Sequence, residues 1–102
     1  MRVYLDDVRI PRNPENWRIV RTAEEALSLV RTGRVSYISF DHDLGTELTG
    51  YDVAKEIEEL VFAGKINCPQ WNIHSANPVG ARAIKAAMES AEEEFTYRNM
   101  VG

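Results

Sequence analysis

The sequence lacks the features that would place it in a membrane or in an oxidising compartment. Cys68 is the single cysteine among 102 residues, so no intramolecular disulfide can form. No run of about 18 apolar residues is present, which excludes a transmembrane helix. The N-terminal stretch MRVYLDD has no apolar signal-peptide region. We therefore expect a cytoplasmic protein that does not bind membranes, and the length predicts a single domain over residues 1–102.

Net positive charge is also lacking, since the formal net charge is −4. Residues 1–34 carry seven arginines and five acids, a balance of +2, whereas residues 35–102 carry five basic residues and eleven acids, a balance of −6. The overall excess of acid argues against nonspecific nucleic-acid binding. A local basic face remains an alternative to an ordinary solvated surface, and it would be built from Arg2, Arg9, Arg12, Arg18 and Arg21.

Strand and helix patterns alternate along the chain. Thr22 and Glu25 form a capping-box signature that opens one helix, which Gly33 closes. A second helix is expected from about Tyr51 to Gly64, and a third begins at Asn77-Pro78. Strands are predicted at residues 2–7, 17–22, 35–41 and 71–75. The tail 95–102 fits a fifth strand, a packed arm or a frayed end.

This alternation predicts an α/β fold: a small, open, mostly parallel sheet of four strands, or five if the tail adds one, with helices on its faces. The connection between the first two strands is unusual, because residues 8–16 form a loop that contains two prolines and no helix pattern. A parallel crossover usually needs about a dozen residues. The two strands are therefore either joined by a tight parallel crossover or antiparallel.

Three predicted strands end in polar, reactive side chains. These ends are Asp6-Asp7, Asp41-His42-Asp43 and His74-Ser75. In open α/β sheets, ligands bind beyond the carboxyl ends of the strands. The strand ends therefore predict one shared site.

Carboxylates that converge repel one another unless a cation neutralises them. Oxygen ligands of this kind suit Mg²⁺ or Mn²⁺. We predict a divalent metal held by Asp6, Asp7 and Asp41, with Asp43 as a further ligand or an orienting group. The alternative is a set of solvated or helix-capping carboxylates.

The two histidines of the chain, His42 and His74, both belong to this set and fit a general acid–base pair. Each could instead be an ordinary loop or strand histidine. Ser75 and Asn77 are candidate phosphate-binding residues, because the start of the third helix offers free amides. Ser75 could equally make a turn hydrogen bond, and Asn77 could act only as a helix cap. No nucleophile-elbow glycines surround Cys68, so a catalytic thiol is not expected.

Three segments, VYLDD, VRTAEEALSLVRTGRVSYISFD and WNIHSAN, resemble the receiver domain of response regulators. The resemblance covers residues 2–90 and implies a flavodoxin-like sheet. It matches Asp6 and Asp7 to the receiver's acidic pair, Asp41 to its phosphoacceptor and Ser75 to its hydroxyl residue. The sequence departs from receivers in three ways: a loop replaces the first helix, no lysine follows Lys85, and the fifth strand and helix are missing or vestigial.

The motifs DHDLG, TGYD and HSANPVG resemble a divergent branch, the cyclic-phosphate-processing receiver family. That resemblance implies a metal-dependent phosphoesterase acting on 2′,3′-cyclic phosphate RNA ends or cyclic nucleotides, so the partner would be an RNA end or a phosphate-containing small molecule. Asp41, His42 and His74 would then be catalytic. The alternatives are a phosphoaccepting signalling module and a binding module without chemistry.

Overall fold

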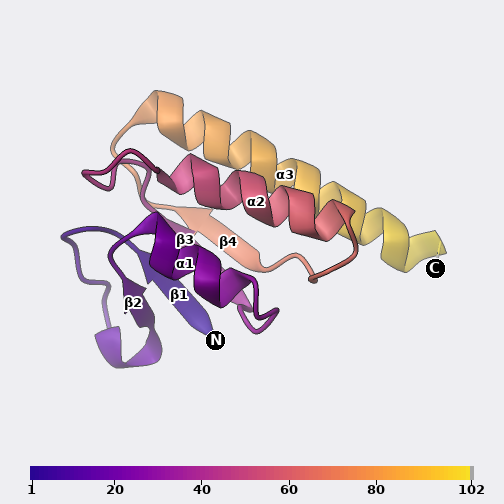
Figure 1. The fold of residues 1–102 in the computed structure, drawn as a ribbon, viewed down its shortest axis with the longest axis horizontal. Helices are drawn as coiled ribbons and strands as arrows, with labels where there is room; N and C mark the ends of the chain where they lie inside the picture. The colour runs from indigo at the N-terminus through magenta and orange to yellow at the C-terminus, as the bar shows by residue number, and fades with distance from the viewer. Residues whose placement is uncertain (102) are drawn as a thin grey trace.

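Four short strands form one sheet in the computed structural model, which describes residues 1–101 (Figure 1). The strand order is β2-β1-β3-β4, and every neighbouring pair is parallel. This arrangement confirms the predicted α/β receiver-like fold. The strands are β1 (Arg2–Leu5), β2 (Arg18–Val20), β3 (Tyr37–Phe40) and β4 (Gln70–Ile73).

The loop between β1 and β2 makes a tight parallel crossover. Within residues 6–17 the only regular element is the 3₁₀ turn η1 (Pro14–Asn16). Asn13 precedes this turn in the left-handed region, with φ of 54°, a conformation that asparagine tolerates better than most residues. The parallel alternative is therefore correct, and the antiparallel one is wrong.

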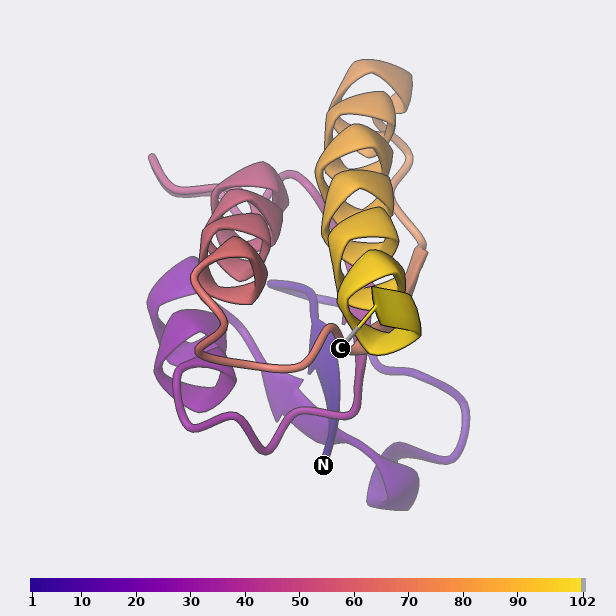
Figure 2. The same cartoon turned by 90° about the vertical axis from the view of Figure 1, so that its right-hand side faces the viewer.

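All three helices lie on the same side of the sheet (Figure 2). They are α1 (Ala23–Val30), α2 (Gly50–Phe62) and α3 (Pro78–Val101). The expected cap at Thr22 is present, since its side chain accepts a hydrogen bond from the Glu25 amide at 3.2 Å. At the start of α2, the Thr49 amide donates to the Asp52 carboxylate at 2.7 Å. The helices that the sequence predicts for the faces of the sheet are therefore all found on one face.

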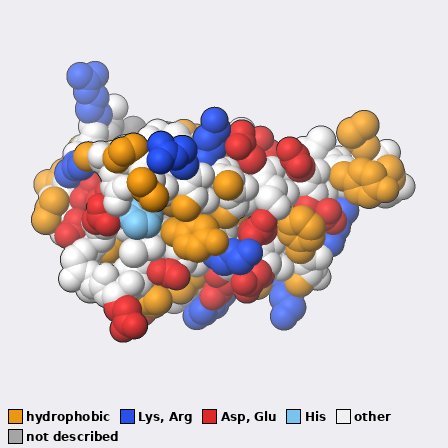
Figure 3. Space-filling view, turned by 90° about the horizontal axis from the view of Figure 1, so that it is seen from above, with side chains coloured by type: hydrophobic (Ala, Val, Ile, Leu, Met, Phe, Trp, Pro, Cys, Tyr) orange, Lys and Arg blue, Asp and Glu red, His pale blue; other side chains and the backbone are white. Residues whose placement is uncertain are grey.

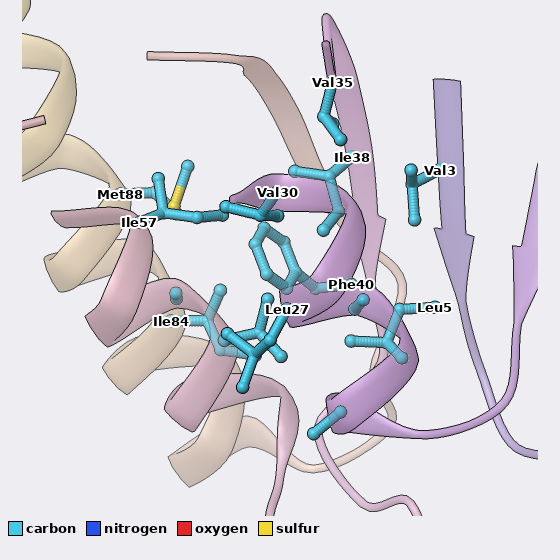
Figure 4. Close-up of a cluster of buried hydrophobic side chains, with 14 of the residues drawn as sticks. Val3, Leu5, Leu27, Val30, Val35, Ile38, Phe40, Ile57, Ile84 and Met88 are labelled. Atoms are coloured by element: carbon cyan, nitrogen blue, oxygen red, sulfur yellow. The ribbon is translucent and has the colours of Figure 1, made fainter. Parts of the chain in front are cut away.

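The core fills the space between the sheet and these helices (Figure 4). Alternate residues of the two central strands point into it, and Val3, Leu5, Ile38 and Phe40 are fully buried. Burial of each such side chain contributes about 1.5–3 kcal/mol relative to exposure. The same alternation turns their sequence neighbours toward the opposite side of the sheet.

Residues 95–101 of the C-terminal tail continue α3 as a helix, so they form neither a fifth strand nor a frayed end, and residue 102 lies outside the described part of the chain. No glycine or proline interrupts residues 81–101, which lets the helix extend. Arg98 attaches the extension to the end of α2 by donating to the carbonyl oxygen of Val61 at 2.9 Å and to that of Phe62. Both carbonyls lie in the last turn of α2, where a helix runs out of amide partners, and that of Val61 also accepts from the Gly64 amide at 3.0 Å.

The outer surface of the helices mixes acidic and basic side chains, with exposed apolar ones gathered where α3 ends (Figure 3). Over residues 1–101, no helix combines the length and apolar character needed to cross a membrane.

Candidate active site

Three carboxylates meet at the carboxyl ends of the central strands. Asp6 follows β1 and Asp41 follows β3, and a backbone hydrogen bond of 2.9 Å from the Asp41 amide to the Leu5 carbonyl keeps the two strand ends in register. Asp6, Asp7 and Asp41 each offer an oxygen, and these oxygens lie within 4.8 Å of one another. Asp6 is fully buried and Asp41 is 6% exposed. The structure thus brings together three of the four predicted metal ligands.

Asp6 is held by several donors. One carboxylate oxygen accepts from the amides of Val8 and Arg9, both at 2.9 Å, and the other accepts from Nε2 of His74 at 3.0 Å. Burial by itself would raise the pKa of Asp6, but these amides and His74 outweigh it and lower the pKa. Asp6 is therefore a fixed, ionised carboxylate.

Asp41 lies beside Asp6, but its surroundings differ from those of Asp6. One of its oxygens accepts from the His42 amide at 2.8 Å. Burial raises the pKa of Asp41, and the negative charge of Asp6 raises it further. The charge on Asp41 is thus less well compensated by the protein than the charge on Asp6.

His74 lies at the end of β4 with both ring nitrogens occupied. Nε2 contacts Asp6, and Nδ1 lies 2.7 Å from the hydroxyl of Ser39. Because an ionised Asp6 only accepts, Nε2 carries a proton, and in the neutral ring Nδ1 is then the acceptor for the Ser39 hydroxyl. Tyr4 stacks on the ring, with centroids 4.4 Å apart and planes at 7°. The geometry makes His74 a positioning group for Asp6.

Sequence analysis did not single out Ser39 or Tyr4. A signal was present, since strand alternation places both on the same side of the sheet as His74.

His42 lies on the helix side of the site. Its Nδ1 is 3.0 Å from a carboxylate oxygen of Asp43, and Nδ2 of Asn77 is 3.2 Å from the other oxygen. The hydrogen bond from His42, followed by that from Asn77, lowers the pKa of Asp43. A Cβ on Gly80 would lie only 2.2 Å from the His42 ring, so α3 needs glycine there. Asp43 is exposed and is not one of the three gathered carboxylates.

Ser75 and Asn77 shape the start of α3. The Ser75 hydroxyl accepts from the Asn77 amide at 3.0 Å, which is a turn hydrogen bond. The side-chain oxygen of Asn77 accepts from the Gly80 amide at 3.0 Å, which caps the helix. Both structural alternatives are therefore present, and the amide nitrogen of Asn77 still faces Asp43.

An open hollow of about 410 Å³ lies beside these groups. Its charged lining consists of Asp7, Asp41, Asp43 and a single cation, Arg9. Arg9 donates from Nη1 to the His74 carbonyl at 2.9 Å, and its Nε lies 3.6 Å from Asp6. The Arg9 side chain is 48% exposed, so its remaining donors can reach a bound anion. Sequence analysis counted Arg9 only toward a basic face, although it follows the acidic pair by two positions.

The donor set fits a hard divalent cation. Carboxylate oxygens are the ligands that Mg²⁺ and Mn²⁺ take in proteins. Like charges at this spacing need a counter-charge, and among the described residues that line the hollow Arg9 is the only cation.

The model for the "Cyclic-phosphate processing Receiver domain" matches residues 1–90. The chain belongs to this family. No curated protein and no solved structure matches the chain. The chain departs from the receiver pattern in two elements: it has no α-helix between β1 and β2, and residues 1–101 contain no fifth strand. One side of its sheet is therefore left without a helical layer.

Proposed function

We propose that this receiver domain is a metal-dependent phosphoesterase that opens cyclic phosphodiesters. The observation that carries the proposal is the cluster of Asp6, Asp7 and Asp41 beside a hollow that also contains Arg9. Three negative groups would hold a divalent cation, and the arginine would bind a phosphoryl oxygen. This pairing suits an anionic ester better than a neutral substrate.

The reaction is a hydrolysis. A water oxygen bonds to phosphorus and gives up a proton, one ring P–O bond breaks, and the departing oxygen takes a proton, which leaves a phosphomonoester. A divalent ion bound at such a site polarises a phosphoryl oxygen and lowers the pKa of a bound water. Asp6, Asp7 and Asp41 would hold Mg²⁺ or Mn²⁺, while Asn77 and the first turn of α3 would orient phosphate oxygens, with Ser75 supporting that turn.

The two histidines have different proposed roles. His42, hydrogen-bonded to Asp43, is the proton carrier, because the carboxylate orients its ring. His74 fixes Asp6 and acts through it. Sequence analysis predicted that both histidines take part in proton transfer, whereas this proposal gives them separate roles, and the difference is testable.

The test is turnover of 2′,3′-cyclic mononucleotides by protein stripped with chelator and then titrated with Mg²⁺ or Mn²⁺. We expect activity only with metal, and Asp41→Asn should abolish it. Glu89→Gln is the matched control, since Glu89 is an exposed acid on α3 and lies outside the site. Absence of turnover with both metals across a panel of cyclic phosphates would overturn the proposal.

Metal titration of the histidine variants separates their roles. His42→Ala should lower kcat by about 10²–10⁴-fold at saturating metal. His74→Ala should instead weaken metal affinity by about 10–100-fold, with much of kcat recovered at high metal concentration. Equal losses of kcat at saturating metal would show that His74 transfers protons directly.

A phosphoaccepting module is the second candidate, because Asp41 lines the hollow beside the acidic pair. Incubation with a small phosphodonor distinguishes the two functions. A stable mass increase that Asp41→Asn removes, without turnover of cyclic phosphates, would favour signalling. Ligand binding without either chemistry would favour a binding module.

A further inference from the structure

The side of the sheet that faces away from the helices carries its own set of side chains. Within residues 1–101, none of the three α-helices covers this side (Figure 2). We call it the open face. Strand register assigns to it Arg2, Tyr4, Trp17, Ile19, Tyr37, Ser39, Gln70, Asn72 and His74.

Aromatic rings occupy the centre of the open face. Trp17 contacts Tyr4 and Tyr37 edge to face, with ring centroids 5.7 Å apart in each pair. The guanidinium of Arg2 lies 4.2 Å from the Trp17 ring centre and 5.2 Å from that of Tyr37. Trp17 and Tyr37 are partly exposed and Arg2 is exposed. The surface therefore offers aromatic rings and a guanidinium together.

A large hollow lies at the amino ends of the strands, opposite the carboxylate site. It measures about 800 Å³ and is lined by both Arg2 and Tyr37, together with Arg34 and Gln70. No acidic residue is among the described residues that line it. None of the nine residues assigned to the open face is acidic, the nearest acids being Asp6 and Asp41 at its carboxyl-end edge, and residues 1–34 carry a net charge of +2. This region therefore attracts an anion, in contrast to the acidic remainder of the chain.

The open face leads directly into the candidate active site. Tyr4 contacts Trp17 on one side and stacks on His74 on the other, and His74 contacts Asp6. From Gln70 to His74 the distance along β4 is about 13 Å, at roughly 3.3 Å per residue. A short extended polymer with one end at the carboxylates can therefore lie across the rings to the hollow.

We infer that the open face binds the nucleotides that precede the terminal phosphate of a single-stranded RNA. This inference rests on the proposed function and narrows its substrate class from cyclic phosphates in general to RNA ends. Single-stranded RNA is recognised by stacking of its bases on aromatic rings and guanidinium groups, and by hydrogen bonds to base edges. The exposed amides of Gln70 and Asn72 supply such hydrogen bonds beside the rings.

A second copy of the chain suits this face less well. Two copies packed through it symmetrically would bring Arg2 and the neighbouring positive charge against their own equivalents. An RNA strand supplies the opposite charge along its whole length.

The test is fluorescence anisotropy with a labelled, short single-stranded RNA that ends in a 3′-phosphate, at low salt. This probe is not hydrolysed, so binding is measured independently of turnover. We expect Tyr37→Ala to weaken binding about tenfold, which is within the range for one lost base stack. Arg2→Gln should weaken binding and reduce its salt dependence. Arg82→Gln and Tyr97→Ala, exposed positions on α3, are the matched controls and should leave binding unchanged.

Turnover provides the second arm. The ratio of kcat/KM for a cyclic-phosphate oligonucleotide to that for a cyclic mononucleotide should exceed one and should fall in Arg2→Gln. RNA binding that these variants weaken, in a protein that opens no cyclic phosphate, would support the open face while the proposed function fails. Mononucleotide turnover without RNA binding would overturn the inference while the function stands. A dimer that Arg2→Gln disrupts, without RNA binding, would overturn it as well.

Discussion

The two sides of the sheet use the same four strands but differ in what their side chains contact. On the helix side, aliphatic residues and Phe40 pack against three helices and are removed from water. On the open face, Trp17 packs on Tyr4 and Tyr37, Arg2 lies over the rings of Trp17 and Tyr37, and Tyr4 stacks on His74. Burial on the helix side stabilises the fold, whereas the open face keeps partly exposed rings that can contact a ligand.

The two histidines lie on opposite sides of the sheet. His42 packs against α3 at Gly80, and His74 packs against Tyr4 and Ser39 on the open face. The candidate active site therefore lies where the two sides meet.

The largest expected difference between the sides is in stability. Phe40→Ala should lower the free energy of unfolding by about 3–5 kcal/mol, because it leaves a cavity among fully buried side chains. Trp17→Ala should cost only about 1–2 kcal/mol, because Trp17 is already partly exposed. Urea unfolding measures both values. Equal costs would show that the open face contributes to stability as much as the core does.

The second largest effect is expected from a divalent ion at the candidate active site, where the two sides of the sheet meet. Binding of the ion should raise the free energy of unfolding. At 100 times its dissociation constant, an ion that binds only the folded state adds about 2.7 kcal/mol. For a domain of this size that corresponds to a rise in Tm of roughly 10–20 °C. Thermal unfolding of chelator-stripped protein with millimolar Mg²⁺ or Mn²⁺ measures the shift. Asp41→Asn should reduce it, and an unchanged Tm with both ions would contradict the metal site.

Gly80→Ala tests the packing of His42 on the helix side. The added methyl group would collide with the imidazole, and overpacking of this kind costs about 1–3 kcal/mol. The double variant His42→Ala, Gly80→Ala should recover most of that loss, because the ring that collides is gone. Double-mutant analysis of urea unfolding gives the coupling. Additive losses would show that the ring does not limit residue 80.

The smallest expected effect is on the pH dependence of folding stability, to which Asp6 and Asp41 contribute in opposite directions. The lowered pKa of Asp6 contributes stability above the unfolded value of about 3.9, which is lost as the pH falls through the folded pKa. The raised pKa of Asp41 contributes stability below about 3.9, which is lost as the pH rises through its folded pKa. Asp41→Asn should therefore remove a decline in metal-free stability above about pH 4.

Urea unfolding in chelator, from roughly pH 3 to pH 8, measures this change. Glu89→Gln is again the control and should keep the wild-type profile. An Asp41→Asn curve parallel to that of the wild type would show that Asp41 titrates normally.

Much of the fold was predictable because it depends on local signals. Apolar alternation marked the central strands, and Thr22 with Glu25 marked the start of α1 at the residue where it begins. The convergence of Asp6, Asp7 and Asp41 was predictable as well, because parallel strands end at the same edge of a sheet. These features follow from residue types and periodicity.

Other features depend on contacts between distant residues. The direction of β2 depends on its pairing with β1, and the helical state of residues 95–101 is supported by the contact of Arg98 with the end of α2. The pKa shifts of Asp6 and Asp41 differ because of their donors, which residue type does not specify. The pairing of His74 with Ser39 and the placing of Arg9 at the hollow also became visible only in three dimensions.

The sequence by itself determined the strands, the helices and the acidic groups at the strand ends, because each depends on residues that are neighbours along the chain. Only the tertiary structure decided that all helices share one side of the sheet, that the other side is aromatic and open, and that each histidine serves a different carboxylate. Those outcomes depend on which distant surfaces bury each other, and that choice is made by packing over the whole molecule.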